Sequence, residues 1–185
     1  MQTVVICNQK GGVGKSVIAD HLAWSMERTG TPYSFYDLDG QGGVIHETKE
    51  NPDASVNIVD TPGALQPEMK NWISNANCIV VPTRASATDM KPLLRMADLL
   101  KDAQCPVIYI LNFWNRYSAA QAFEQWFKET FGNALVLKLP QSEMIAQAMA
   151  FKQSVVEYAP KAPVTTAMTE LTDAVRKHIG LETEL

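Results

Sequence analysis

NQKGGVGKS, residues 8–16, stands between an apolar run at residues 3–7 and an amphipathic stretch at residues 15–28. The apolar run predicts a β-strand, and the apolar spacing that follows predicts a helix. A glycine-rich loop that ends in Gly-Lys-Ser between a strand and a helix is typical of a phosphate-binding P-loop. The opening of the sequence therefore predicts an α/β nucleotide-binding fold and disfavours a glycine-rich turn with a chance lysine.

Each residue type in this loop suits one part of a nucleoside triphosphate with its magnesium ion. Glycines allow the backbone to direct N–H groups at an anion, and the helix that follows adds its N-terminal dipole. Lys15 brings a positive charge to the β and γ phosphates, and the Ser16 hydroxyl is a natural Mg²⁺ ligand. The predicted ATP-binding residues are Gly11, Gly12, Val13, Gly14, Lys15, Ser16 and Val17.

Apolar runs and amphipathic stretches alternate along the rest of the chain. Strands are expected at residues 3–7, 33–37, 56–60, 78–82, 107–112 and 135–139. Helices are expected at residues 15–28, 66–75, 88–101, 119–131, 142–151 and 164–178, and residues 40–55 are expected to form a loop. Strands that are apolar throughout are covered on both faces, as in a parallel sheet. We therefore predict one doubly wound α/β domain over residues 1–185, with a mostly parallel sheet between helices.

Composition narrows the classes of function. With 46% apolar and 19% charged residues, the chain is expected to fold alone. Its net charge of -4 does not attract nucleic acid as a whole, so DNA contact needs a local basic patch. Cys7, Cys78 and Cys105 suit buried reduced thiols rather than disulfides or a metal site. Without a leader or a long apolar run, a cytoplasmic protein that does not enter the membrane is expected.

Three aspartates follow the ends of predicted strands. Asp37 and Asp39 are two residues apart at the end of a predicted strand, and only one of them is expected to align best with an attacking water. Asp60 ends an apolar strand and precedes Thr61-Pro62-Gly63, which is the Walker B position. We expect Asp60 to hold Mg²⁺, and the residues after it to form a switch that responds to the γ-phosphate.

The lysine that opens the loop carries a resemblance to a known family. KGGVGKS, with Lys10 in first place, resembles the deviant Walker A motif of the ParA/MinD ATPases. The resemblance implies an ATP-dependent homodimer in which Lys10 reaches the nucleotide of the other subunit. The alternative is an exposed lysine that acts only on its own subunit's phosphates.

YDLDGQGG, residues 36–43, resembles the DxDPQG segment of the partition ATPases, with Gly40 in place of proline. The resemblance implies that Asp37 orients the water and that Asp39 senses the γ-phosphate, although Asp39 could simply cap a turn. Only about twenty residues separate Asp39 from Asp60, which indicates that a peripheral helix of the family is missing.

Later segments extend the resemblance. PTRASATDMKPL, residues 82–93, resembles the dimer-contacting loop and helix, and LPQSEMIAQA, residues 139–148, resembles a proline loop near the base. LNFWN, residues 111–115, ends a strand at the position where the family contacts adenine. Asn112 is therefore the expected adenine contact. A strand-end turn is the alternative role for Asn112.

The family also implies partners. A basic strip of Lys152, Lys161, Arg176 and Lys177 could bind DNA nonspecifically, or could be an ordinary solvated helical face. The P-loop strand starts the chain, so no helix-turn-helix is expected before it, and the acidic ending LETEL is unlike a membrane anchor.

The function that this resemblance implies is an ATPase switch for plasmid or chromosome segregation, nucleoid-associated when ATP-bound and stimulated by a ParB-like adaptor. One alternative is a metabolic P-loop kinase or ATP-dependent ligase. Another is a ParA-like positioning factor for a conjugation or secretion complex.

Overall fold

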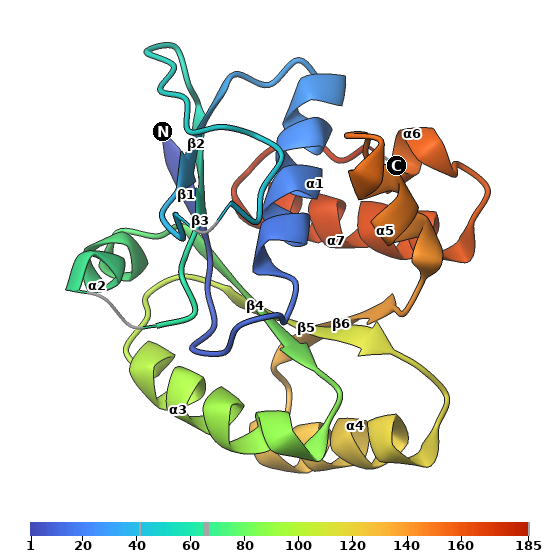
Figure 1. Cartoon of the computed structure of the whole chain (residues 1–185). Helices are drawn as coiled ribbons and strands as arrows, with labels where there is room; N and C mark the ends of the chain where they lie inside the picture. The colour runs from blue at the N-terminus through green and yellow to red at the C-terminus, as the bar shows by residue number, and fades with distance from the viewer. Residues whose placement is uncertain (41, 65–66, 185) are drawn as a thin grey trace.

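One sheet of six parallel strands forms the centre of the computed structural model, which describes residues 1–40, 42–64 and 67–184 (Figure 1). The strands are β1 (Gln2–Ile6), β2 (Tyr33–Asp37), β3 (Val56–Asp60), β4 (Cys78–Arg84), β5 (Val107–Trp114) and β6 (Leu135–Pro140). Their order is β2-β3-β1-β4-β5-β6, and each pair is parallel. The predicted doubly wound α/β class is confirmed.

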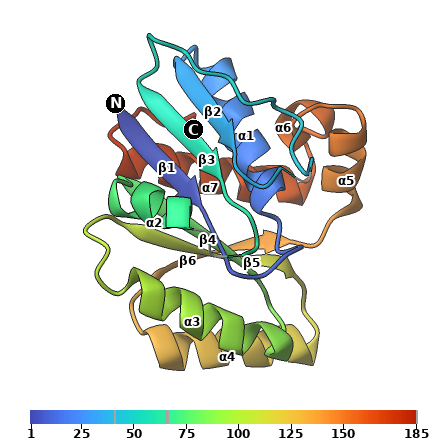
Figure 2. The ribbon, with the colours of Figure 1, turned by 60° about the vertical axis from the view of Figure 1, so that its left-hand side comes forward.

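Helices cover both faces of the sheet (Figures 1 and 2). One layer holds α1 (Lys15–Arg28), α5 (Glu143–Ala150), α6 (Val155–Tyr158) and α7 (Pro163–His178). The other holds α2 (Pro67–Ser74), α3 (Met90–Leu100) and α4 (Ser118–Phe131). In both views α3 and α4 run together on the face opposite α1 and α7.

Alternation along β1 divides the apolar residues between two cores. Val4 and Ile6 pack with α1 and α7, whereas Val5 and Cys7 pack with α3 and α4. Successive side chains of a strand point to opposite faces, so an unbroken apolar run fills both layers. The same burial leaves Cys7 and Cys78 as free buried thiols, while Cys105 is only partly buried.

Several boundaries differ from the predicted ones. β4 and β5 each run two residues further than expected, to Arg84 and Trp114. A 3₁₀ turn at Ala87–Asp89 precedes α3, and the single turn of α6 was not expected because one turn is too short to show a helical period. The expected start of α2 at Gln66 lies outside the described residues.

The position of β1 decides where a ligand can bind. β1 lies between β3 and β4, while the chain that leaves it passes through α1 to β2 at the edge of the sheet. In an open α/β sheet, ligands bind beyond the carboxyl ends of the strands, where the strand order reverses. The loop after β1 stands at that point.

Candidate nucleotide-binding site

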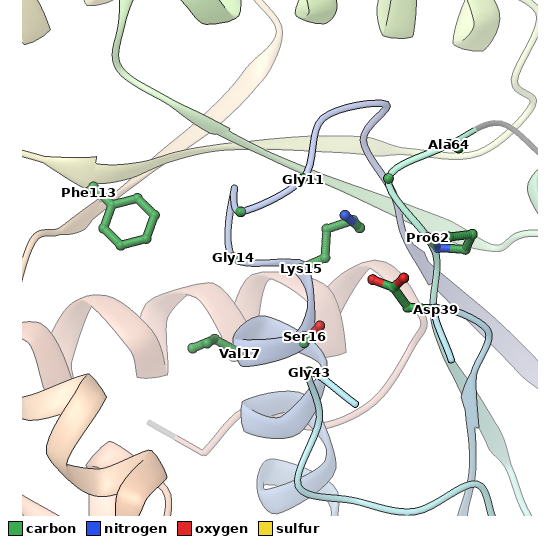
Figure 3. Close-up of a pocket in the computed structure, with 12 residues that line it drawn as sticks. Gly11, Gly14, Lys15, Ser16, Val17, Asp39, Gly43, Pro62, Ala64 and Phe113 are labelled. Carbon is green, nitrogen blue, oxygen red and sulfur yellow. The ribbon is translucent and has the colours of Figure 1, made fainter. Parts of the chain in front are cut away.

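A cavity of about 730 Å³ lies over the carboxyl ends of β1, β2 and β3 (Figure 3). Its lining residues are Gly11, Gly12, Gly14, Lys15, Ser16, Val17, Asp39, Gly43, Pro62, Gly63, Ala64 and Phe113. Most of the residues predicted to bind ATP therefore share one cavity, with Val13 buried beneath them. Lys10, Asp37, Asp60 and Asn112 are not among the residues that line it.

Two side chains hold the outer side of the loop. Arg84 donates from Nε to the Gly12 carbonyl at 3.0 Å, and Asn112 donates from Nδ2 to the Val13 carbonyl at 2.8 Å. In a trans peptide the N–H that follows points away from its carbonyl. The N–H groups of Val13 and Gly14 therefore turn away from Arg84 and Asn112, as an anion-binding loop requires.

Gly14 is the loop position where an added side chain would approach another residue most closely. Its φ is 98°, and a Cβ built there would lie 2.1 Å from the Asn112 amide nitrogen. Glycine adopts this conformation without a steric penalty. Any other residue at position 14 would therefore displace the Asn112 amide, which occupies the space that its side chain would need.

Lys15 begins α1 and is almost fully buried, with its side chain extending into the cavity (Figure 3). Its ammonium group lies 3.4 Å from the Lys10 carbonyl oxygen. A charge placed at a helix N-terminus and sheltered from solvent is suited to phosphate oxygens. The assignment of Lys15 to the β and γ phosphates stays a prediction, and this geometry supports it.

Asp60 is a buried carboxylate without a compensating hydrogen bond. It has no exposed surface, and neither oxygen has a partner among the described residues. Burial raises the pKa of Asp60 to about 7, while the nearby Ser16 hydroxyl and Lys15 charge act in the opposite direction. Magnesium takes hard oxygen ligands and shares them with phosphate. Asp60 and Ser16 therefore fit the ion of a magnesium nucleotide.

Asp37 and Asp39 take different positions, because Asp37 is the last residue of β2 and Asp39 lies in the loop that follows. Asp39 lines the cavity, with its carboxylate directed into it in Figure 3. Asp37 Oδ1 instead accepts the Asp39 backbone N–H at 3.0 Å. The family resemblance gave the water to Asp37, whereas this arrangement favours Asp39 as the carboxylate nearer the phosphates.

The segment after Asp39 is fastened to α1 by a residue that sequence reasoning missed. Asp20 is fully buried and accepts the backbone N–H groups of Ile45 and His46 at 2.9 Å each. His46 Nδ1 lies 2.6 Å from the same carboxylate. Asp20 lies one helical turn after Ser16, on the same face of the predicted helix. An aspartate at that spacing was the sequence signal that could have identified it.

The bonds to Asp20 hold the segment after Asp39 close to Ser16, the predicted magnesium ligand. A Cβ at Gly43 would lie 2.8 Å from the Ser16 hydroxyl oxygen. The described part of residues 40–55 contains no helix and instead pairs with the edge of the sheet through Phe35 and Lys49. A loop was predicted here, and the structure confirms it for the described residues.

Lys10 lies on the outer side of the loop and does not line the cavity. Its ammonium group is 2.7 Å from Asp89 Oδ2 and 3.2 Å from Thr88 Oγ1. Asp89 is buried at the start of α3, which belongs to the segment expected to form dimer contacts. The two lysines of the motif thus point to different places.

A second, smaller cavity of about 320 Å³ adjoins the first and is mainly apolar. It is lined by Val17, Gly43, Asn112, Phe113, Leu139, Pro140, Ser142, Ile145, Ala146 and Met149. The predicted proline loop and the end of β5 therefore meet. Asn112 reaches this cavity, but its amide nitrogen binds Val13 and its oxygen accepts the Phe113 N–H. Adenine contact by Asn112 stays a prediction.

The basic strip near the C-terminus needs a correction. Arg176 is buried, with 3% of its surface exposed, and it donates to the Glu182 carbonyl and to Thr29. Apolar packing on α7 draws the stem inward while these oxygens satisfy the guanidinium. Lys152, Lys161 and Lys177 are exposed and are the members of the strip that could meet a partner. None of the helices within the described ranges is long and apolar enough to cross a membrane.

The parallel sheet, the glycine loop before α1 and the buried strand-end aspartate define a P-loop nucleotide-binding protein. Residues 4–155 match the family described as the CobQ/CobB/MinD/ParA nucleotide binding domain. The chain belongs to this family, and its predicted resemblance to the ParA/MinD ATPases is confirmed.

Known relatives agree with this placement. The chromosome-partitioning ATPase Soj of Thermus thermophilus is 22% identical, with 97% of each chain covered. That alignment spans 241 positions, more than the 185 residues of this chain, so Soj has segments that are missing here.

Solved structures show the same fold. A Cyanothece McdA variant in complex with ATP has a TM-score of 0.82 at 15% identity, covering 100% of this chain and 98% of that one. MinD of Pyrococcus horikoshii complexed with Mg-ADP has a TM-score of 0.76 at 15% identity, with 100% and 99% covered.

Proposed function

We propose that this protein is a ParA-like ATPase that positions DNA or another large cargo. In this proposal ATP and Mg²⁺ join two subunits, the dimer binds DNA without sequence preference, and an adaptor protein stimulates hydrolysis. The family match supports the nucleotide-binding ATPase part, and the similarity to the chromosome-partitioning ATPase Soj supports the partition role.

The observation that carries the proposal is that two lysines of one loop take different positions relative to the cavity. Lys15 extends into the cavity, whereas Lys10 is outside it and pairs with Asp89. Lys15 is therefore placed for the phosphates of its own subunit, and Lys10 is not. A lysine on the outer side of the loop is instead placed to meet a triphosphate presented by a second subunit.

Hydrolysis requires an oriented water in line with the γ-phosphate. Asp39 is our candidate for that role, because its carboxylate faces the cavity. Asp37 supports it by accepting the Asp39 backbone N–H. Asp60 and Ser16 would hold Mg²⁺, which would supply positive charge to the phosphate oxygens.

DNA binding rests on exposed lysines rather than on net charge. The chain is acidic overall at -4, so contact must come from a local patch. Lys152, Lys161 and Lys177 are exposed on or beside the helices of the α7 layer. In this proposal the protein is cytoplasmic and associates with the nucleoid only while ATP holds the dimer together.

The experiment that tests the proposal measures mass by light scattering with a slowly hydrolysed ATP analogue. Wild type should shift from monomer to dimer, and Lys10→Ala should stay monomeric while binding ATP within about tenfold, or 1.4 kcal/mol, of wild type. Lys101→Ala, in an exposed pair with Asp98, serves as the matched control and should dimerise normally. A monomeric wild type, or a Lys10→Ala protein that dimerises as well, would refute the sandwich dimer.

DNA retention is measured in parallel. Binding should require ATP, ignore sequence and weaken steeply with salt, because each lysine–phosphate contact releases counterions. Reversing Lys152, Lys161 and Lys177 to Glu should abolish it without changing dimerisation. If wild type shows no ATP-dependent retention at low salt, the cargo is not DNA, and a scaffold or a metabolic substrate takes its place.

A further inference from the structure

Phe113 has a backbone conformation that a bulky residue rarely adopts. Its φ is 54°, in the left-handed region that glycine favours. Lys152 is the other non-glycine residue with positive φ within the described parts of the chain, and it lies in an exposed turn. Strain of this kind persists where surrounding contacts fix the residue, and it concentrates at functional sites.

The strand pairing explains how the ring is displaced. Asn112 pairs with Leu139 and Trp114 pairs with Pro140, so Phe113 is one extra residue in β5. A bulge of this kind removes a residue from the ladder and redirects its side chain. Here it turns the Phe113 ring toward the nucleotide cavity (Figure 3).

The ring lies where the two cavities meet. Phe113 lines the polar cavity over the P-loop and also the apolar cavity beside the proline loop. Val17 and Gly43 line both as well, but Phe113 is the only aromatic residue of the three. A nucleotide whose phosphates fill the first cavity and whose base enters the second must pass this ring.

Arg84 contacts the Phe113 ring, and Asn112 links the Phe113 backbone to the P-loop. The Arg84 guanidinium lies 4.9 Å from the centre of the Phe113 ring while its Nε donates to the Gly12 carbonyl. The Phe113 backbone N–H donates to Asn112, which binds the Val13 carbonyl. An arginine over one face of an aromatic ring is attracted to it and leaves the other face free.

We propose that Phe113 stacks on the base of the bound nucleotide, and that Arg84 is the positioning residue that holds the ring for it. Stacking uses the π-face that every base has, so Phe113 adds affinity without choosing among bases. The inference rests on the nucleotide binding proposed above and adds the residues that recognise the nucleoside half.

The test compares ATP with inorganic tripolyphosphate, which has no base, by calorimetric titration in magnesium. Phe113→Gly is the informative variant, because glycine adopts the positive φ without strain and the backbone stays as it is. ATP affinity should fall about tenfold or more, and tripolyphosphate affinity should stay within about twofold. Tyr117→Ala removes an exposed aromatic residue that lines neither cavity, and it should change neither affinity.

Arg84 is tested through a double-mutant cycle. Arg84→Ala should weaken ATP more than tripolyphosphate in the wild-type background, and this extra loss should disappear when Phe113 is already glycine. Arg84→Lys keeps the charge without the planar stack, so it should recover part of the tripolyphosphate affinity and little of the base-dependent part.

The outcomes separate this inference from the proposed function. Equal losses for ATP and tripolyphosphate in Phe113→Gly, or no loss for either, would overturn the stacking role without contradicting the assignment of the phosphate site. A wild type that binds neither ligand would instead overturn the nucleotide site itself. An Arg84→Ala loss that persists unchanged without the ring would show that Arg84 serves only the P-loop.

Discussion

Lys10 Nζ lies 2.7 Å from Asp89 Oδ2, which joins the first residue of the P-loop motif to the start of α3. The Asp89 side chain is 1% exposed, and its second oxygen has no partner within the described residues, so Lys10 provides its compensating charge. The Lys10 side chain is 30% exposed, so it can leave the ion pair more readily than the Asp89 side chain can. In the proposed dimer, Lys10 must exchange this carboxylate for the partner's phosphates, so the pair opposes dimerisation.

Replacing Asp89 by Asn should therefore favour the dimer. The substitution keeps the shape and removes the negative charge that retains Lys10, so less ATP analogue should be needed to form half of the dimers. A shift of about three- to tenfold is expected, in line with a partly exposed ion pair worth about 1 kcal/mol. Light scattering across an analogue titration gives the measurement.

The control for that variant is Asp98→Asn, which removes the exposed pair with Lys101 on the same helix. It should leave the titration unchanged. If Asp89→Asn needs as much analogue as wild type, the ion pair does not restrain dimerisation.

Lys15→Ala should lose nucleotide binding. The ammonium group is nearly buried in the cavity, and a charged contact to phosphate is much stronger there than in water. We expect affinity for ATP to drop about 100-fold or more, which is ~3 kcal/mol. Equilibrium titration with a fluorescent ATP analogue measures it, and undiminished affinity would contradict the P-loop assignment.

The two aspartates after β2 should differ in hydrolysis. Asp39→Ala should slow single-turnover hydrolysis by about 10²-fold with ATP binding retained, because Asp39 faces the cavity. Asp37→Ala should have a smaller effect, through the loss of the bond that orients Asp39. A larger effect at Asp37 would restore the role that the family resemblance gave it.

His21 should make the fold sensitive to mild acid. Burial lowers the pKa of His21 to about 4, and its Nε2 accepts the Val155 N–H at 3.1 Å. The unfolded chain binds a proton near the ordinary pKa of about 6.5, while the folded chain does not until about pH 4. Stability is therefore full above about pH 6.5 and falls as the pH drops, by about 2 kcal/mol at pH 5.

Urea denaturation at about pH 7.5 and about pH 5 measures this contribution. His21→Gln should be less stable at the higher pH and lose less on acidification than wild type. His178 is a suitable comparison, because its Nδ1 also lies near the carbonyl of the residue four positions back but its ring is exposed. If His178→Gln and His21→Gln show the same dependence, burial of His21 is not the cause.

Local sequence signals located most of the residues that line the candidate phosphate cavity. Residues 8–16 could be interpreted as a P-loop from the sequence, because the glycines, Lys15 and the start of α1 are adjacent in the chain. Apolar runs located all six strands, and their double-sided burial follows from the period of two. Asp60 could be proposed as a magnesium ligand because it is the last residue of such a run.

Contacts between distant residues could not be predicted in the same way. Asp20 holds a loop about 25 residues away, Arg84 of β4 meets Phe113 of β5, and Lys10 pairs with Asp89, which is 79 residues further along the chain. The sequence determined which residues end each strand, because periodicity and turn chemistry are local. Only the tertiary structure decided which of those ends meet, since strand order and the bulge at Phe113 depend on packing of the whole sheet.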